Sequence, residues 1–237
     1  MQEVRLSLIN YVGRYPLIFG YLAELGSGRD LLVRQTTDLC VEAPPRSGNS
    51  FFVVGFKMAN PLAVVAHHHH VPAQVIKAFR LKVPVVTILR NPIDSALAKA
   101  APGNEPFLIG TTLRRWLTFW GRLKSRLELA SPVTFESVIS NPGGVIDAVN
   151  KKYGTGFSTE FPDEKAVFAS IEASRRSILG PASDSTPSPN VPDSRTAEME
   201  KILRPMAEAH PRAREALVLY DDVRSQMALR GLSLGPV

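Results

Sequence analysis

The run Val-Pro-Val-Val-Thr-Ile-Leu at residues 83–89 constrains the fold of this chain most strongly. It is rich in β-branched residues and carries no charge, which predicts a strand buried on both of its faces. A shorter run at residues 62–66, Leu-Ala-Val-Val-Ala, has the same character. Strands covered on both faces belong to a parallel sheet with helices on either side, so we expect an α/β protein.

The rest of the chain alternates strands and helices around these two runs. Another strand is expected over 37–43, where Pro44 and Pro45 end it, and a further one over 132–135. Helices are expected before residue 26, as two short segments, and at 48–59, 72–80, 93–100, 112–129, 143–153, 163–178, 196–208 and 211–230. This order predicts a three-layer, doubly wound, mostly parallel sheet that binds ligands at the carboxyl ends of its strands.

A length of 237 residues fits one domain. Within it we expect N-terminal helices over residues 1–36, a nucleotide-binding core over 37–155 and a helical region over 156–237. Pro, Ser and Asp dominate residues 180–194, and no apolar period survives there. That segment is therefore predicted to be a mobile loop.

Composition and charge narrow the classes of function. A single cysteine, Cys40, excludes an intramolecular disulfide and a multi-cysteine metal centre. The 28 Lys and Arg against 22 Asp and Glu give a net charge of +6, which suits an anionic ligand. These basic residues are scattered rather than clustered, which argues against nucleic acid. No long apolar run or apolar leader is present, so we expect a cytoplasmic protein without a transmembrane segment.

The first segment that carries chemistry joins the strand at 37–43 to the next helix. It reads Pro45-Arg46-Ser47-Gly48-Asn49-Ser50-Phe51. Free backbone N–H groups and the helix dipole attract phosphate at a helix start, and glycine lets the backbone approach the ligand closely. The loop lacks the lysine and the first glycine of a nucleoside triphosphatase, which disfavours that class. The alternative is an ordinary strand-to-helix turn.

Two further segments follow strand ends. Arg90 comes directly after the strand at 83–89, where its planar guanidinium suits phosphate, or else pairs with Asp94. Four histidines at 67–70 follow the strand at 62–66. Consecutive side chains on an extended segment point to alternate faces, and no further ligands complete a set, so a metal site is disfavoured. One histidine acting as a general base fits better.

Together these segments resemble the sulfotransferases that use 3′-phosphoadenosine 5′-phosphosulfate (PAPS). The loop at 45–51 is similar to the family's 5′-phosphosulfate loop, and Arg90-Asn91-Pro92-Ile93-Asp94 is similar to its 3′-phosphate element. The segment that holds the family's catalytic histidine resembles His70-Val71-Pro72-Ala73-Gln74. Phe135-Glu136-Ser137 and Asn141-Pro142 are similar to a later segment of the family. The likeness covers about residues 38–155.

The resemblance implies transfer of a sulfuryl group from PAPS to a hydroxyl or amine, with release of adenosine 3′,5′-bisphosphate and without a metal. His70 would be the catalytic base, and Arg46 would grip the sulfuryl group. Contacts to the donor molecule would come from Arg46, Ser47, Gly48, Asn49, Ser50, Phe51, Arg90, Ser95 and Phe135. For the two phenylalanines the alternative is a place in the core. The acceptor would be a glycan, a lipid-linked sugar or a small hydroxyl compound.

Departures from the family pattern keep other functions open. Ala98 stands where the family usually has a serine, with Ser95 one turn earlier and Lys99 beside it, and Asn49 replaces a threonine. The alternatives are a module that binds the bisphosphate without catalysis and an ATP-using phosphotransferase. We expect one of three arginines to close over the donor: Arg175, Arg176 or Arg195. Two segments are expected to form the walls of the acceptor site, residues 102–111 and 180–194.

Overall fold

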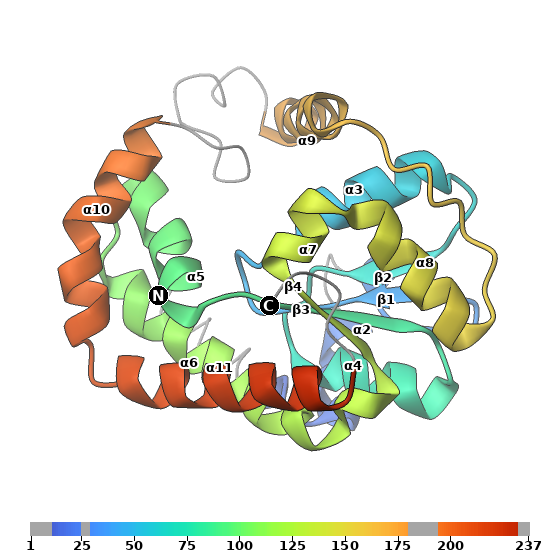
Figure 1. Cartoon of the computed structure of the whole chain (residues 1–237), viewed down its shortest axis with the longest axis horizontal. Helices are drawn as coiled ribbons and strands as arrows, with labels where there is room; N and C mark the ends of the chain where they lie inside the picture. The colour runs from blue at the N-terminus through green and yellow to red at the C-terminus, as the bar shows by residue number, and fades with distance from the viewer. Residues whose placement is uncertain (1–10, 25–28, 180–193, 232–237) are drawn as a thin grey trace.

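The computed structural model describes residues 11–24, 29–179 and 194–231 (Figure 1). The first part of the chain forms α2 (Pro16–Glu24), η1 (Arg29–Leu31), β1 (Leu39–Val41), α3 (Asn49–Ala59), β2 (Val65–His67), α4 (Pro72–Leu81), β3 (Val85–Leu89) and α5 (Pro92–Ala100). There follow η2 (Ala101–Gly103), α6 (Phe107–Leu123), η3 (Lys124–Leu129), β4 (Ser131–Thr134), α7 (Phe135–Ser140), α8 (Pro142–Tyr153), α9 (Glu164–Leu179), α10 (Ser194–Ala209) and α11 (Ala213–Leu229).

The four strands of the described residues form one parallel sheet in the order β2-β1-β3-β4, which confirms the predicted α/β class. From β1 the chain crosses through α3 to β2 on one side. It then returns through α4 to β3, which lies on the other side of β1. The connections that leave β1 and β3 therefore run in opposite directions, and in open α/β sheets ligands generally bind beyond the carboxyl ends of two such strands.

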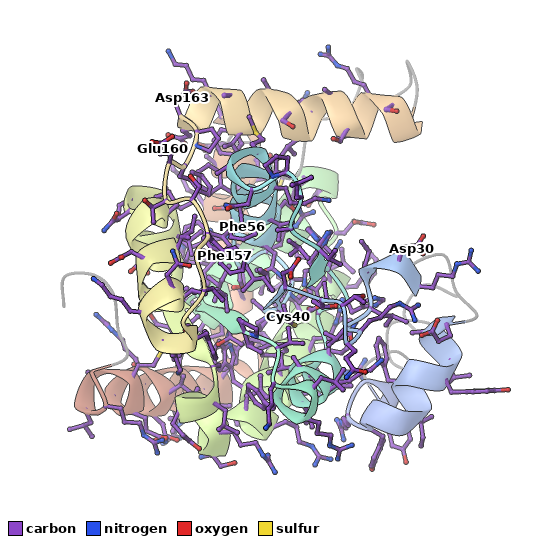
Figure 2. All side chains as sticks on the ribbon, turned by 90° about the vertical axis from the view of Figure 1, so that its right-hand side faces the viewer. Asp30, Cys40, Phe56, Phe157, Glu160 and Asp163 are labelled. Atoms are coloured by element: carbon purple, nitrogen blue, oxygen red, sulfur yellow. The ribbon has the colours of Figure 1, made fainter. Side chains whose placement is uncertain are left out.

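Successive residues of β1 face two different cores. Leu39 and Val41 belong to a cluster with side chains of α3, α7, α8 and α9. Cys40 belongs to a second cluster with side chains of α4, α5, α6, α10 and α11. Figure 1 shows the two groups of helices on opposite sides of the sheet, and Cys40 lies near the middle of the molecule in Figure 2. Coverage of both faces explains why β1 is wholly apolar and why four of the five residues of β3 are apolar.

The dipeptide Asn-Pro begins two of the helices by the same local chemistry. At the start of α5, Oδ1 of Asn91 accepts a hydrogen bond from the backbone N–H of Ile93 at 2.9 Å. At the start of α8, Oδ1 of Asn141 accepts one from Gly144 at 3.0 Å. The proline that follows each asparagine has no N–H to leave unpaired in the first turn. Both helix starts are thus determined within a few residues.

Several predicted boundaries are wrong. Helix α6 begins at Phe107 and gives way to the 3₁₀ segment η3 at Lys124, so part of the expected acceptor wall at 102–111 is helix. Strand β2 begins at Val65 rather than Leu62, because its pairing starts level with the first residue of β1. Phe135 begins α7 instead of ending a strand.

A threonine explains the unforeseen helix α7. Oγ1 of Thr134 accepts a hydrogen bond from the backbone N–H of Ser137 at 3.1 Å, which caps the helix directly after β4.

Of the predicted mobile loop at 180–194, residues 180–193 lie outside the described residues, and Ser194 begins α10. Within the described ranges, no helix is both long and apolar enough to cross a membrane.

Candidate functional site

The strand register brings three loops to one edge of the sheet. Val41, the last residue of β1, pairs with His67, the last residue of β2. The loop after β1 and the histidine segment after β2 therefore begin at the same level. On the other side of β1, strand β3 continues to Leu89, and Arg90 follows it at the same edge. The three segments singled out from the sequence thus become neighbours.

Two hydrogen bonds connect these loops directly. The Arg90 guanidinium donates through Nη1 to the backbone carbonyl of Arg46 at 2.6 Å. The His70 ring lies with Nδ1 at 2.8 Å from the backbone carbonyl of Ala43. Both carbonyls belong to the loop between β1 and α3, so this loop holds one side chain from each neighbouring segment.

The loop between β1 and α3 has a backbone shape that its glycine permits. Gly48 has φ of 89° and caps α3, and a Cβ there would lie 3.2 Å from the ring of Phe135. Arg46 has φ of 66°, a left-handed conformation that costs a non-glycine residue about 1–2 kcal/mol. The bond from Arg90 to the Arg46 carbonyl helps to hold this strained conformation.

Two buried polar side chains in the loop retain unused hydrogen-bonding capacity. Ser47 is fully buried and Asn49 nearly so. The Ser47 Oγ and the Asn49 Oδ1 have no hydrogen-bond partner among the described residues. A buried polar atom without a partner costs about 1–3 kcal/mol. The Ser47 hydroxyl can donate to an anion at the start of α3, where the helix dipole also favours negative charge.

Four cations interact around the loop. Burial, and then the charge of Arg90, lowers the pKa of Arg46 to about 10. Burial lowers the pKa of Arg115, on α6, to about 10. Burial, followed by the charges of Arg46 and Arg115, lowers the pKa of Lys99 at the end of α5. Like charges gathered in a partly buried place create a strong preference for an anionic ligand.

His70 is in the protonation state that a general base needs. The carbonyl of Ala43 can only accept, so Nδ1 of the His70 ring carries the hydrogen and Nε2 keeps its lone pair. The amide of Asn49 lies farther from the same nitrogen, at 3.5 Å. Burial, followed by the charge of Arg115, lowers the pKa of His70 well below its ordinary value. The ring therefore stays neutral, with the lone pair of Nε2 unprotonated.

Glu42 is a site residue that the sequence analysis did not identify. Its side chain is fully buried, and its two carboxylate oxygens accept the backbone N–H groups of His69 at 2.9 Å and His70 at 2.6 Å. Burial raises the pKa of Glu42 to about 8, against the two backbone hydrogen bonds and the charge of Arg115, which lower it. The signal for this residue in the sequence was a charged side chain at the end of an apolar strand, directly before Ala43 and the two prolines that follow it.

His67 and His68 form a chain of contacts that ends on Ser50, in the first turn of α3. Nε2 of His68 lies 2.9 Å from the hydroxyl of Ser50, and its Nδ1 contacts Nδ1 of His67. Burial, followed by neighbouring histidines, lowers the pKa of His67 to about 3 and that of His68 to about 4. Within the described part of the chain, no group of three or more His, Cys, Asp and Glu is placed to hold a metal.

The remaining residues predicted to contact the donor molecule lie in three different surroundings. Phe135 lies beside the loop, with the guanidinium carbon of Arg90 4.1 Å from its ring centroid. Phe51 instead faces the core, where its ring packs against two phenylalanines at 5.5 Å. Ser95 is buried, and its hydroxyl donates to the carbonyl of Asn91 at 3.0 Å within α5.

The loop that carries Arg90 is fixed by a tryptophan that the sequence analysis did not single out. Nε1 of Trp116, on α6, donates to the backbone carbonyl of Arg90 at 3.0 Å. Asp94, the alternative partner considered for Arg90, forms an ion pair with Arg204 of α10 at 2.9 Å.

The three arginines expected to close over the donor remain predictions. Arg175 pairs with Glu172 on α9 at 3.4 Å, Arg176 lies one residue further along α9, and Arg195 lies in the first turn of α10.

No family model, curated protein or solved structure matches this chain.

Proposed function

We propose that this protein transfers a sulfuryl group from PAPS to a hydroxyl or amine of an acceptor and releases adenosine 3′,5′-bisphosphate. The fold that goes with this function is a three-layer sheet protein with a P-loop-like phosphate-binding loop. One observation carries the proposal: the bond of 2.6 Å between the Arg90 guanidinium and the Arg46 carbonyl, which joins two separate phosphate-binding candidates. The lone pair of His70 at the same edge of the sheet supports it.

In this mechanism the loop holds the 5′ end of the donor. Arg46 and the N–H groups of residues 47–50 bind the phosphosulfate, and Arg90, lying against Phe135, binds the 3′-phosphate. A bond forms between the acceptor oxygen or nitrogen and sulfur while the bond from sulfur to the bridging oxygen breaks. The acceptor proton passes to Nε2 of His70. Negative charge develops on the leaving phosphate, and fixed cations lower the barrier by stabilising that charge.

A second candidate is a module that binds the bisphosphate but has lost catalysis. It is favoured by α5, where Ala98 offers no hydroxyl and the Ser95 hydroxyl is engaged within the helix. An ATP-using phosphotransferase is the third, and the absence of a loop lysine weighs against it.

Calorimetric titration with adenosine 3′,5′-bisphosphate tests the donor site without knowledge of the acceptor. We expect micromolar affinity for the bisphosphate and much weaker binding of ADP and ATP, which lack the 3′-phosphate. Arg90→Ala removes charged hydrogen bonds, each worth about 1.5–3 kcal/mol, so the affinity should fall about tenfold or more. The matched control is Arg80→Ala, on an exposed position of α4, which should bind as the wild type does.

Two outcomes of this titration would count against the proposal. Equal affinity for ADP and the bisphosphate would mean that no group reads the 3′-phosphate. Preference for ATP would make the phosphotransferase the leading candidate. Tight binding of the bisphosphate, together with no release of bisphosphate from PAPS across a broad acceptor panel, would favour the non-catalytic module.

A further inference from the structure

Glu42 is a buried carboxylate that the mechanism above does not use. It directly follows β1, and its backbone N–H donates to the carbonyl of Val86 on β3 at 3.1 Å. This bond extends the sheet by one residue beyond Val41 and fixes where the Glu42 side chain begins. The side chain is fully buried, so its carboxylate is not a surface group that water would satisfy.

The carboxylate reaches across to the segment that follows β2. One oxygen accepts from the backbone N–H of His69 at 2.9 Å, and the other accepts from that of His70 at 2.6 Å. That segment needs such support, because His68 and His70 have φ of 65° and 56°. Side chains other than glycine rarely adopt this left-handed conformation, and surrounding contacts must hold it in place.

The stretch of chain that carries Glu42 also holds the imidazole ring of His70. The carbonyl of Ala43, the residue after Glu42, accepts from Nδ1 of that ring at 2.8 Å. His70 is therefore held at two points by adjacent residues: its backbone by the Glu42 carboxylate and its ring by the Ala43 carbonyl. The Ala43 carbonyl determines which ring nitrogen keeps the lone pair, and the Glu42 contacts hold the backbone that places the ring against that carbonyl.

We propose that Glu42 is a positioning residue for His70, which keeps the ring in the Nδ1–H form with Nε2 unprotonated. This inference rests on the proposed function, in which Nε2 accepts the acceptor proton. Glu42 acts through His70 and does not touch the donor molecule.

A carboxylate suits this task better than any other side chain. Two N–H donors face it, and a glutamate side chain offers an oxygen to each of them in either protonation state. A glutamine of the same length would keep one oxygen but turn an NH₂ group toward the second N–H. Aspartate is one methylene shorter and cannot span the same gap. The charge of Arg115, on α6, favours the ionised form of Glu42, but burial outweighs it and raises the pKa to about 8.

Glu42→Gln tests the proposal, with Glu198→Gln as the matched control. Glu198 is an exposed residue of α10 whose carboxylate pairs with Lys201, so the control makes the same chemical change on the surface. Three quantities are measured in each protein: the nitrogen spectrum of the imidazoles without ligand, the affinity for adenosine 3′,5′-bisphosphate, and release of bisphosphate from PAPS with water as the acceptor. Loss of a resonance in His70→Ala assigns the His70 signals.

We expect Glu42→Gln to change the base and spare the nucleotide site. The His70 imidazole should shift from the Nδ1–H form to a mixture of tautomers. Release of bisphosphate should slow by about 10–100-fold, since a misplaced catalytic group costs about that much. The bisphosphate affinity should remain within about threefold of the wild type. Glu198→Gln should match the wild type in all three measurements.

Either of two results would overturn the role of Glu42. An unchanged tautomer with a wild-type rate would show that the carboxylate does not position the ring. A large loss of bisphosphate affinity would show that Glu42 supports the phosphate loop instead. If the wild-type protein bound no bisphosphate, the proposed function would fail, and the imidazole spectrum of the unliganded protein would still decide whether Glu42 positions His70.

Discussion

At the scale of single residues, the loop between β1 and α3 depends on backbone shape as much as on side-chain chemistry. Gly48 lies between a buried serine and a buried asparagine, and its φ of 89° turns the chain into α3. The ring of Phe135 covers it so closely that no Cβ fits without moving that ring. Because Phe135 also contacts the Arg90 guanidinium, a shift of the ring would also displace that guanidinium, which is the second candidate for binding phosphate.

Gly48→Ala should therefore lower both stability and nucleotide affinity. The control is Gly154→Ala, which also has a positive φ, of 68°, but has nothing within 4 Å of its Cβ position. The left-handed conformation alone should cost the control about 1–2 kcal/mol of unfolding free energy. We expect a larger loss at Gly48, measured by urea unfolding, and weaker bisphosphate binding there only. Equal losses in the two variants would show that the Phe135 contact has no energetic consequence.

At the scale of secondary-structure elements, α6 supports the loop after β3. Trp116 and Trp120 are both fully buried in its core-facing stripe, one turn apart. The Trp116 indole donates to the carbonyl of Arg90, whereas the Trp120 Nε1 has no partner among the described residues. The helix therefore contributes a specific hydrogen bond at one position and only packing at the other.

This contrast makes Trp116→Phe and Trp120→Phe a matched pair. Both variants lose similar buried volume, but only Trp116→Phe leaves the Arg90 carbonyl without its donor, which costs about 1–3 kcal/mol. We expect Trp116→Phe to be the less stable of the two in urea unfolding, and to bind the bisphosphate more weakly. If Trp120→Phe were as damaging to nucleotide binding, the effect would come from core volume and not from the bond to Arg90.

At the scale of the whole molecule, protonation links the site to global stability. The pKa of His67 is lowered to about 3 and that of His68 to about 4, chiefly by burial. Below pH 6.5 the unfolded chain binds protons on these groups and the native chain does not, so the free energy of unfolding falls as pH falls. Glu42, with its pKa raised to about 8, acts in the opposite direction between about pH 4.5 and 8.

His68→Gln should make the stability of the protein less dependent on pH. One titrating histidine contributes a slope of up to about 1.4 kcal/mol per pH unit between its native and unfolded pKa values. Urea unfolding at several pH values between 6.5 and 4.5 should show a shallower loss in the variant than in the wild type. Parallel curves for the two proteins would mean that His68 is protonated in the native state.

Much of the fold could be predicted from the sequence, because the signals involved act over a few residues. Uncharged β-branched runs predict buried strands, and Asn-Pro at residues 91–92 and 141–142 specifies two helix starts. Parallel strands that end at one edge also predicted that Arg46, Arg90 and the histidine segment lie together, as they do. The start of α6 was predicted too late, at residue 112, although Pro106 directly before the helix is a local start signal.

The sequence by itself determined the alternation of elements, the glycine loop before α3 and the residue types available for binding an anion. Only the tertiary structure decided that Glu42 meets the backbone of His70, that Trp116 holds Arg90, and that Phe51 faces the core. Those contacts join residues far apart in the chain. They depend on strand order, strand register and the packing of helices on the sheet, which no local pattern of residues encodes.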